Sequence, residues 1–113
     1  MKYVFDERLI AEDGRRLSQA APDAQVILFG SAARGELTED SDVDFLVIER
    51  DVEDRHAEQV RLSRELRSLR FPVDVIVVSR RYADEWGGAK GSMVHAALTE
   101  GRVVHAGASA SNG

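Results

Sequence analysis

Three short apolar runs, each rich in β-branched residues, constrain the fold of this chain more than any other feature of its sequence. They span Val26–Phe29, Val43–Ile48 and Val73–Val78. Runs of this length next to glycine, proline and polar residues are typical of buried strands. The sequence therefore predicts a sheet of at least three strands, with a turn at Gly30, and function often sits at such strand ends.

Helical patterns separate these runs. Apolar residues recur at helical spacing before Pro22, and Asp51 or Asp54 could cap a helix in the middle of the chain. Ser92 and Gly101 are typical of the start and the stop of a short helix. Helices are therefore predicted over Asp6–Ala21, Asp54–Leu69 and Ser92–Thr99, with one further helical turn over Tyr82–Trp86.

The order of these elements predicts an α/β (α+β) domain, with a small mixed sheet and helices packed against it. Val103-Val104 is predicted as a last edge strand. We expect one domain over residues 1–106. Residues 107–113, Gly-Ala-Ser-Ala-Ser-Asn-Gly, are predicted to form a flexible tail.

Composition excludes several classes of function. Cysteine is absent, so no disulfide framework, thiolate zinc site or cysteine nucleophile is possible. The formal net charge of −5 opposes the electrostatic attraction that dominates non-specific nucleic-acid binding. No stretch approaches the roughly 20 apolar residues that span a bilayer, and the N-terminus lacks a signal-peptide pattern. We therefore expect a cytoplasmic protein that does not act at a membrane, and the net charge disfavours nucleic acid as its direct substrate.

The segment from Gly30 to Asp44 joins the first two predicted strands and carries most of the chemical information. It opens with Gly30-Ser31, a small turn that leaves a strand and leads into a short helix. Such a turn lets backbone N–H groups and the Ser31 hydroxyl approach phosphate oxygens closely. The segment therefore predicts a phosphate-binding turn.

The same segment ends with two carboxylates, Asp42 and Asp44, on either side of Val43. On an extended backbone both carboxylates project to one side, about 7 Å apart at their Cα atoms. Carboxylates so placed can share hard divalent cations, and two-metal phosphoryl-transfer sites hold ions about 3.5–4 Å apart. Two Mg²⁺ ions are the expected occupants.

A third carboxylate, Asp74, lies at the start of the third predicted strand between Val73 and Val75. A charge in a core strand requires a cation, a hydrogen-bond network or solvent at the strand end. If the third strand pairs beside the second, Asp74 completes a triad with Asp42 and Asp44. Its expected role is then metal ligand and general base toward an incoming hydroxyl.

Together these residues resemble the signature of the DNA polymerase β-like nucleotidyltransferase superfamily. The shared pattern is Gly30-Ser31, ten residues, Asp42-x-Asp44 and a later Asp74, with Arg34-Gly35 and Ser41 inside it. The resemblance covers about Val26 to Val104. The short chain is most similar to the minimal nucleotidyltransferases (MNT), which often form the antitoxin half of a HEPN/MNT toxin–antitoxin pair.

The resemblance implies that AMP is transferred from ATP to a hydroxyl with release of pyrophosphate. Gly30 and Ser31 would hold the triphosphate, and Arg34 and Ser41 are further nucleotide-binding candidates. Asp42 and Asp44 would hold the two Mg²⁺ ions, and Asp74 would serve the acceptor side. In the toxin–antitoxin relatives the acceptor is a tyrosine of the HEPN ribonuclease, so the expected role is that of an AMPylating antitoxin.

Other readings of the same residues stay open. The domain could neutralise its partner by complex formation without catalysis, or be a subunit that modifies a small molecule or RNA, and it could form homo- or hetero-oligomers. Arg34 could contact phosphate or pair with Glu36 or Asp40. The arginines of the middle helix are expected to form a solvated face with intrahelical ion pairs; they are Arg61, Arg64, Arg67 and Arg70. The three histidines share no metal-ligand spacing; they are His56, His95 and His105.

Overall fold

The computed structural model describes residues 7–34, 43–66 and 73–107 of the 113-residue chain. Its helices and strands are α1 (Glu7–Ala20), β1 (Gln25–Phe29), the 3-10 helix η1 (Ser31–Arg34), β2 (Asp44–Glu49), α2 (Arg55–Ser63), β3 (Asp74–Ser79), α3 (Arg80–Trp86), α4 (Met93–Glu100) and β4 (Arg102–His105). Residues 108–113 of the predicted tail lie outside the described ranges. None of the helices described is long and apolar enough to cross a membrane.

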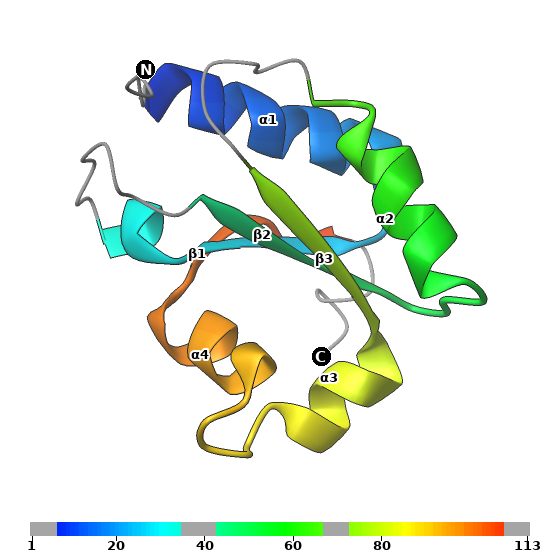
Figure 1. The fold of residues 1–113 in the computed structure, drawn as a ribbon, viewed down its shortest axis with the longest axis vertical. Coiled ribbons are helices and arrows are strands. Elements are labelled where there is room, and N and C mark those ends of the chain that lie inside the picture. Colours follow the sequence, from blue (N-terminus) through cyan, green and yellow to red (C-terminus); the bar gives the residue numbers. More distant parts are fainter. Residues whose placement is uncertain (1–6, 35–42, 67–72, 108–113) are drawn as a thin grey trace.

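The four strands form one mixed sheet in the order β3-β2-β1-β4. β1 runs antiparallel to both β2 and β4, whereas β2 and β3 are parallel and are connected through α2. Figure 1 shows α1 and α2 on one side of the sheet and α3 and α4 on the other. The small mixed sheet with packed helices that the sequence predicts is therefore confirmed.

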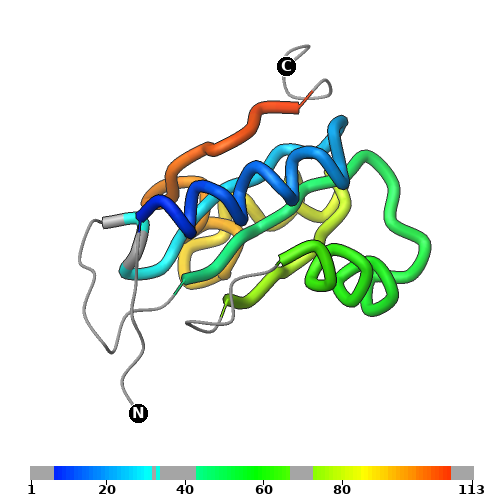
Figure 2. The backbone as a smooth tube through the Cα atoms, turned by 90° about the horizontal axis from the view of Figure 1, so that it is seen from above, coloured from blue at the N-terminus to red at the C-terminus, as the bar shows by residue number. Residues whose placement is uncertain are grey.

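Side chains on both faces of β2 and β3 pack in the protein cores, which explains why these strands are nearly continuous apolar runs. Phe45 and Val47 pack with Ile10, Leu17 and other residues of one core. The alternate residues of β2 pack in a second core with α3 and α4; this core contains Ile27, Leu46, Ile48, Val78, Ala83, Val94 and Ala97. Viewed from above in Figure 2, α1 lies between β4 and α2.

The middle helix is shorter than the sequence predicts. The structure ends α2 at Ser63 instead of Leu69. Beyond Ser63 the hydrogen bonds tighten, because Glu65 N–H donates to the Leu62 carbonyl and Leu66 N–H donates to the Ser63 carbonyl. Such i→i+3 bonds are common where an α-helix ends. Residues 67–72, which include Arg67, Leu69 and Arg70, lie outside the described ranges.

Helix starts follow the sequence more closely. Asp54 is the N-cap of α2 and accepts a hydrogen bond of 3.0 Å from Ala57 N–H. Ser92 is the N-cap of α4, as predicted, and its hydroxyl accepts from His95 N–H at 3.0 Å. The predicted turn at Tyr82–Trp86 is instead α3, which begins at Arg80 with Ser79 as its N-cap. Local side-chain capping therefore sets where these helices begin.

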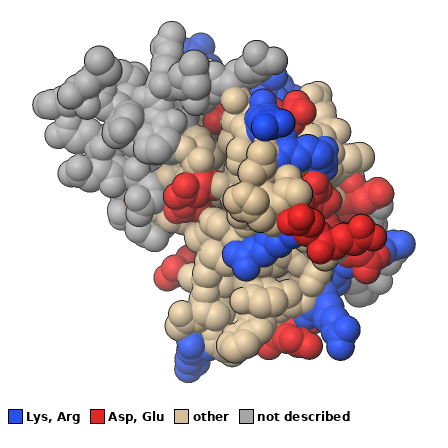
Figure 3. All heavy atoms as spheres, turned by 45° about the vertical axis from the view of Figure 1, so that its right-hand side comes forward, with Lys and Arg blue, Asp and Glu red and all other residues tan. Residues whose placement is uncertain are grey.

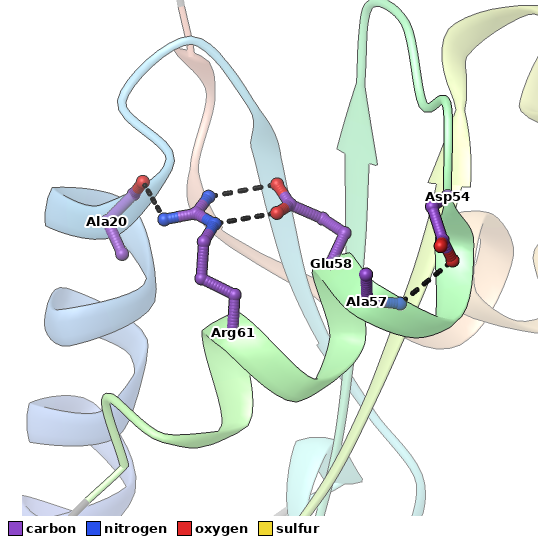
Figure 4. Close-up of polar contacts among 5 residues, drawn as sticks. All are labelled: Ala20, Asp54, Ala57, Glu58 and Arg61. Carbon is purple, nitrogen blue, oxygen red and sulfur yellow. Dashed lines mark hydrogen bonds and ion pairs between the residues drawn. The ribbon is translucent and has the colours of Figure 1, made fainter.

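Arg61 links α2 to the end of α1 (Figure 4). Its guanidinium donates to both carboxylate oxygens of Glu58, at 2.6 and 2.9 Å, and to the Ala20 carbonyl at 3.2 Å. The last carbonyls of a helix have no partner within that helix, so this contact satisfies one of them. The predicted intrahelical pairing of Arg61 is confirmed, and one further bond ties two helices together.

Glu49, the last residue of β2, lies next to this pair. Burial raises the pKa of Glu49 to about 7, and the neighbouring Glu58 adds to the increase because a protonated Glu49 can donate to the Glu58 carboxylate. Hydrogen bonds from Arg61 and with Glu49 lower the pKa of Glu58 to about 2. The three side chains are therefore most compatible with one another when Glu49 is protonated and Glu58 is charged.

We predict that Glu49→Gln makes the fold more stable at about pH 8 but not at about pH 5. Between the ordinary pKa of 4.5 and about 7, the native state holds a proton on Glu49 that the unfolded chain releases, so stability falls as pH rises. Glutamine mimics the protonated side chain and removes this loss. Urea unfolding across this pH range tests the prediction, with exposed Glu53→Gln as the control. Parallel pH profiles for the wild type and Glu49→Gln would contradict it.

Gly101, predicted as a helix stop, is the C-cap of α4 and lies directly against β1. A Cβ atom there would lie 2.6 Å from Ile27 Cγ2 and 2.9 Å from the Leu28 carbonyl oxygen, and too close to the Ala97 carbonyl oxygen. The crowding involves backbone atoms on both sides. Only glycine therefore fits without a shift of α4 relative to the sheet.

We predict that Gly101→Ala lowers the free energy of unfolding by about 1–3 kcal/mol, the usual cost of forcing extra volume into a packed site. Gly88→Ala is the matched control, because a Cβ atom at Gly88 would meet no atom within 4 Å. Urea unfolding measures both variants. Equal effects of the two substitutions would show that contact with β1 is not what requires glycine at position 101.

Candidate active site

The turn after β1 has the backbone that the sequence predicts at Gly30. This residue has a φ of 85°, a left-handed conformation that favours glycine. Ala33 N–H donates to the Gly30 carbonyl at 3.1 Å and closes the first turn of η1, which begins at Ser31. The chain therefore leaves β1 through a tight turn directly into a short helix.

The start of β2 lies between this turn and the start of β3. Asp44 pairs with Phe29, the residue before Gly30, on one side, and with Asp74 on the other. Asp74 N–H donates to the Val43 carbonyl at 3.1 Å and begins the parallel ladder. The third strand does pair beside the second, which is the condition for the triad, and this pairing brings Asp44 and Asp74 next to each other.

Alternation along the strands decides where these two carboxylates project. Phe45 and Val75 follow them directly and are buried in the core under α1 and α2. Because successive side chains point to opposite faces, Asp44 and Asp74 share the other face, on the side of α3 and α4. Their pairing across one ladder therefore places two carboxylates on one face at one end of the sheet.

Solvent reaches this end of the sheet. Asp74 is exposed and Asp44 is half-buried. Of the three explanations that a charge in this strand allows, the structure favours solvent at the strand end. The site is therefore accessible to a ligand from outside the fold.

Several predicted site residues cannot be placed. Ser41 and Asp42 lie outside the described residues, and nothing can be said of the Arg34 side chain. Within the described ranges, no group of three His, Cys, Asp or Glu side chains could hold a metal ion. The position of Asp42 relative to Asp44 therefore remains a prediction from the alternation of an extended chain.

The described carboxylates fit Mg²⁺ in chemistry. Mg²⁺ prefers hard oxygen ligands and is usually held by one or two carboxylates together with substrate phosphates and water. Asp44 and Asp74 supply two carboxylates on one face, and the Gly30 turn, typical of a phosphate-binding turn, lies at the end of the adjoining strand β1. The arrangement can hold a divalent cation between protein carboxylates and a phosphate chain.

A cleft of about 390 Å³ adjoins Asp74 on the side of β3 away from β2. It is lined by one face of α2 and by the start of β3, with the residues His56, Gln59, Val60, Ser63, Arg64, Val73, Asp74 and Val75. Sequence reasoning did not assign this cleft, since it counted Arg64 in a solvated stripe and His56 as a surface residue. The spacing of the α2 residues by three and four positions was the available signal.

A second cleft, of about 310 Å³, lies at the opposite edge of the sheet, between α1 and β4. Its lining includes Ile10, Ala11, Val103 and Val104. The sheet order separates β4 from β2 and β3 by the full width of β1. This cleft therefore does not adjoin the paired carboxylates.

The three histidines have separate environments. His95 Nδ1 lies 2.9 Å from the Gly87 carbonyl oxygen, and His105 Nε2 lies 3.0 Å from the Pro22 carbonyl oxygen. His56 lines the cleft on α2. Within the part of the chain that the structure describes, none of them belongs to a metal-binding cluster.

Comparisons with known proteins agree with this geometry. Residues 10–98 match the family model described as nucleotidyltransferase domain. A search of curated proteins gave no significant match. The fold is similar to that of a candidate nucleotidyltransferase from Sulfolobus solfataricus, solved by crystallography at 1.40 Å, with a TM-score of 0.56, 22% identity, and coverage of 85% of this chain and 76% of that one. At this identity the structural likeness supports the fold alone. Because the family model spans most of the chain and includes both paired strands, the chain belongs to the nucleotidyltransferase domain family.

Proposed function

We propose that this protein transfers AMP from ATP to a hydroxyl group, that Mg²⁺ supports the reaction, and that the acceptor is a tyrosine of a partner HEPN-type ribonuclease toxin. The observation that carries the proposal is the pairing of Asp44 with Asp74 beside the strand that ends at Gly30. The toxin partner, and with it the antitoxin role, is supported by the resemblance of the Gly30-to-Asp74 pattern to the MNT antitoxins.

Each residue has a defined task in this proposal. The backbone N–H groups of the Gly30-Ser31 turn bind phosphate oxygens of ATP. Asp42 and Asp44 bind the metal ions, and Asp74 lies on the side of the acceptor hydroxyl. Mg²⁺ bound by these carboxylates would neutralise phosphate charge and polarise the α-phosphoryl group.

In the proposed reaction Asp74 takes up one proton, and pyrophosphate is the leaving group. Asp74 accepts the proton of the acceptor hydroxyl, whose oxygen forms a bond to the α-phosphorus. The bond between the α-phosphorus and the oxygen bridging to the β-phosphorus breaks, and pyrophosphate leaves with that electron pair. The exposure of Asp74 supports its assignment to the acceptor side, because a hydroxyl carried by another molecule can reach it.

We predict that Asp44→Asn reduces AMP transfer by about two orders of magnitude or more, the scale of losing one preorganised electrostatic group. The measurement is transfer of α-labelled ATP onto lysate proteins or a purified HEPN partner, read on a denaturing gel with Mg²⁺ and with EDTA. Asp42→Ala should behave in the same way. Asp51→Asn is the control, because Asp51 is exposed beyond the opposite end of β2.

The fold must be intact for this test to count. Circular dichroism and thermal unfolding should be similar for wild type and all three variants, because Asp44 and Asp51 lie outside both cores and Asp42 is expected to project to the same side as Asp44. Transfer that persists in folded Asp44→Asn would contradict the metal role of Asp44. A partner that co-purifies with wild type and variants without being labelled would instead support the non-catalytic binding module.

A further inference from the structure

The cleft beside Asp74 presents one face of α2 to solvent. Its helical residues follow a spacing of three or four and are His56, Gln59, Val60, Ser63 and Arg64. Val60 is 38% exposed, and Val73 and Val75 line the cleft beside Asp74. The cleft therefore combines apolar surface with polar side chains, and it borders Asp74, whose carboxylate projects from the edge strand toward the opposite face.

Gln59 determines how a partner can approach this edge of the sheet. Its Oε1 accepts hydrogen bonds from Val77 N–H at 3.0 Å and from Arg55 Nε at 3.2 Å. An outward-facing backbone N–H of the edge strand is thus already satisfied by a side chain. A partner cannot extend the sheet past Val77 without displacing Gln59, so side-chain contacts must dominate its binding.

Arg64 differs from the other arginines of α2. Arg61 is held by Glu58 and the Ala20 carbonyl, and Arg55 donates to Gln59. The Arg64 side chain is exposed and has no ion pair or hydrogen bond to any described residue. Among the described residues nothing compensates this guanidinium, which is a strong ligand for a carboxylate.

The sheet order separates this guanidinium from the phosphate-binding turn. The Gly30 turn follows β1, whereas the cleft that Arg64 lines adjoins β3, and β2 with Asp44 stands between these two strands. Triphosphate at the Gly30 turn would therefore occupy one side of the carboxylates. A molecule in the Arg64 cleft would approach from the other side, where Asp74 lies.

We propose that this cleft selects the acceptor and that it binds a protein segment in which a tyrosine lies next to acidic residues. The inference rests on the proposed function. Arg64 pairs with a carboxylate of that segment on the α2 side of β3, Val60 and Val73 contact its apolar part, and the tyrosine passes the exposed edge of β3 so that its phenolic hydroxyl reaches Asp74 on the other face. The phenolic oxygen forms the bond to the α-phosphorus, its proton passes to Asp74, and pyrophosphate is released.

Charge on the surrounding surface favours a protein segment over RNA. Figure 3 shows acidic and basic side chains interspersed on this side of the molecule rather than a continuous basic surface. The chain carries a net charge of −5, which repels a polyanionic backbone. The Arg64 guanidinium can recognise one or two carboxylates, whereas RNA binding uses many basic contacts.

The test uses two random copolymers as probes, one of Glu and Tyr and one of Lys and Tyr, each labelled with fluorescein. Binding is measured by fluorescence anisotropy, and AMP transfer is measured with α-labelled ATP. The wild type should bind and label the Glu/Tyr copolymer in preference to the Lys/Tyr copolymer. Arg64→Glu should weaken binding of the Glu/Tyr copolymer by about tenfold or more and leave the KM for ATP unchanged.

Matched variants separate charge from fold. Arg64→Gln removes the charge but keeps a polar side chain, and it should give an intermediate loss. Arg81→Glu reverses an exposed charge on α3, away from the cleft, and should behave as wild type. Circular dichroism checks that each variant is folded.

The outcomes distinguish failure of this inference from failure of the proposed function. Three results would overturn the acceptor cleft. The wild type could bind the two copolymers equally. Arg64→Glu could bind the Glu/Tyr copolymer with unaltered affinity, or it could change the KM for ATP and leave copolymer binding as it is. Labelling of an added oligoribonucleotide in place of the Glu/Tyr copolymer would overturn it in favour of RNA.

Because anisotropy needs no catalysis, the Asp44→Asn variant should retain the binding preference. If that preference holds while the wild type transfers no AMP, the proposed function fails and the cleft remains a binding site for acidic tyrosine-containing segments.

Discussion

The parallel ladder between β2 and β3 is the constraint on which the candidate site depends. Its register sets Asp44 beside Asp74, and that register is held by side chains packed on both faces of the sheet. A slip of one residue would place Asp44 beside Val75 and move one carboxylate to the opposite face. Apolar residues such as Phe45 and Leu46 therefore position the carboxylates, although they take no part in chemistry.

The helix that connects these strands has a structural role and also lines the cleft beside Asp74. Arg61 and Glu58 fasten it to the end of α1, and Gln59 satisfies the outer edge of β3. Once these contacts are made, the Arg64 side chain has no partner among the described residues. Two arginines three positions apart thus differ in environment, because Arg61 lies beside a carboxylate of its own helix and Arg64, the C-cap, lines an open cleft.

The carboxylates at the two ends of β2 lie in different environments. At its last residue, burial and the neighbouring Glu58 raise the pKa of Glu49, so that a proton is favoured there. At its first residue, the adjoining Asp74 lies exposed to solvent, where a carboxylate keeps its hydration and can exchange it for a cation. Burial along one strand therefore separates a structural acid from acids available to ligands.

The sequence by itself determined the features that depend on local backbone geometry. The strands, the turn at Gly30 and the caps at Asp54 and Ser92 follow from residue type and short-range spacing, and the structure confirms them. Tertiary structure decided the rest. Asp44 and Asp74 are thirty residues apart, so only the packing of α2 against the sheet brings them together. The same packing forms the cleft beneath Arg64. No local pattern contains that information, because long-range register is set by the burial of side chains on several elements at once.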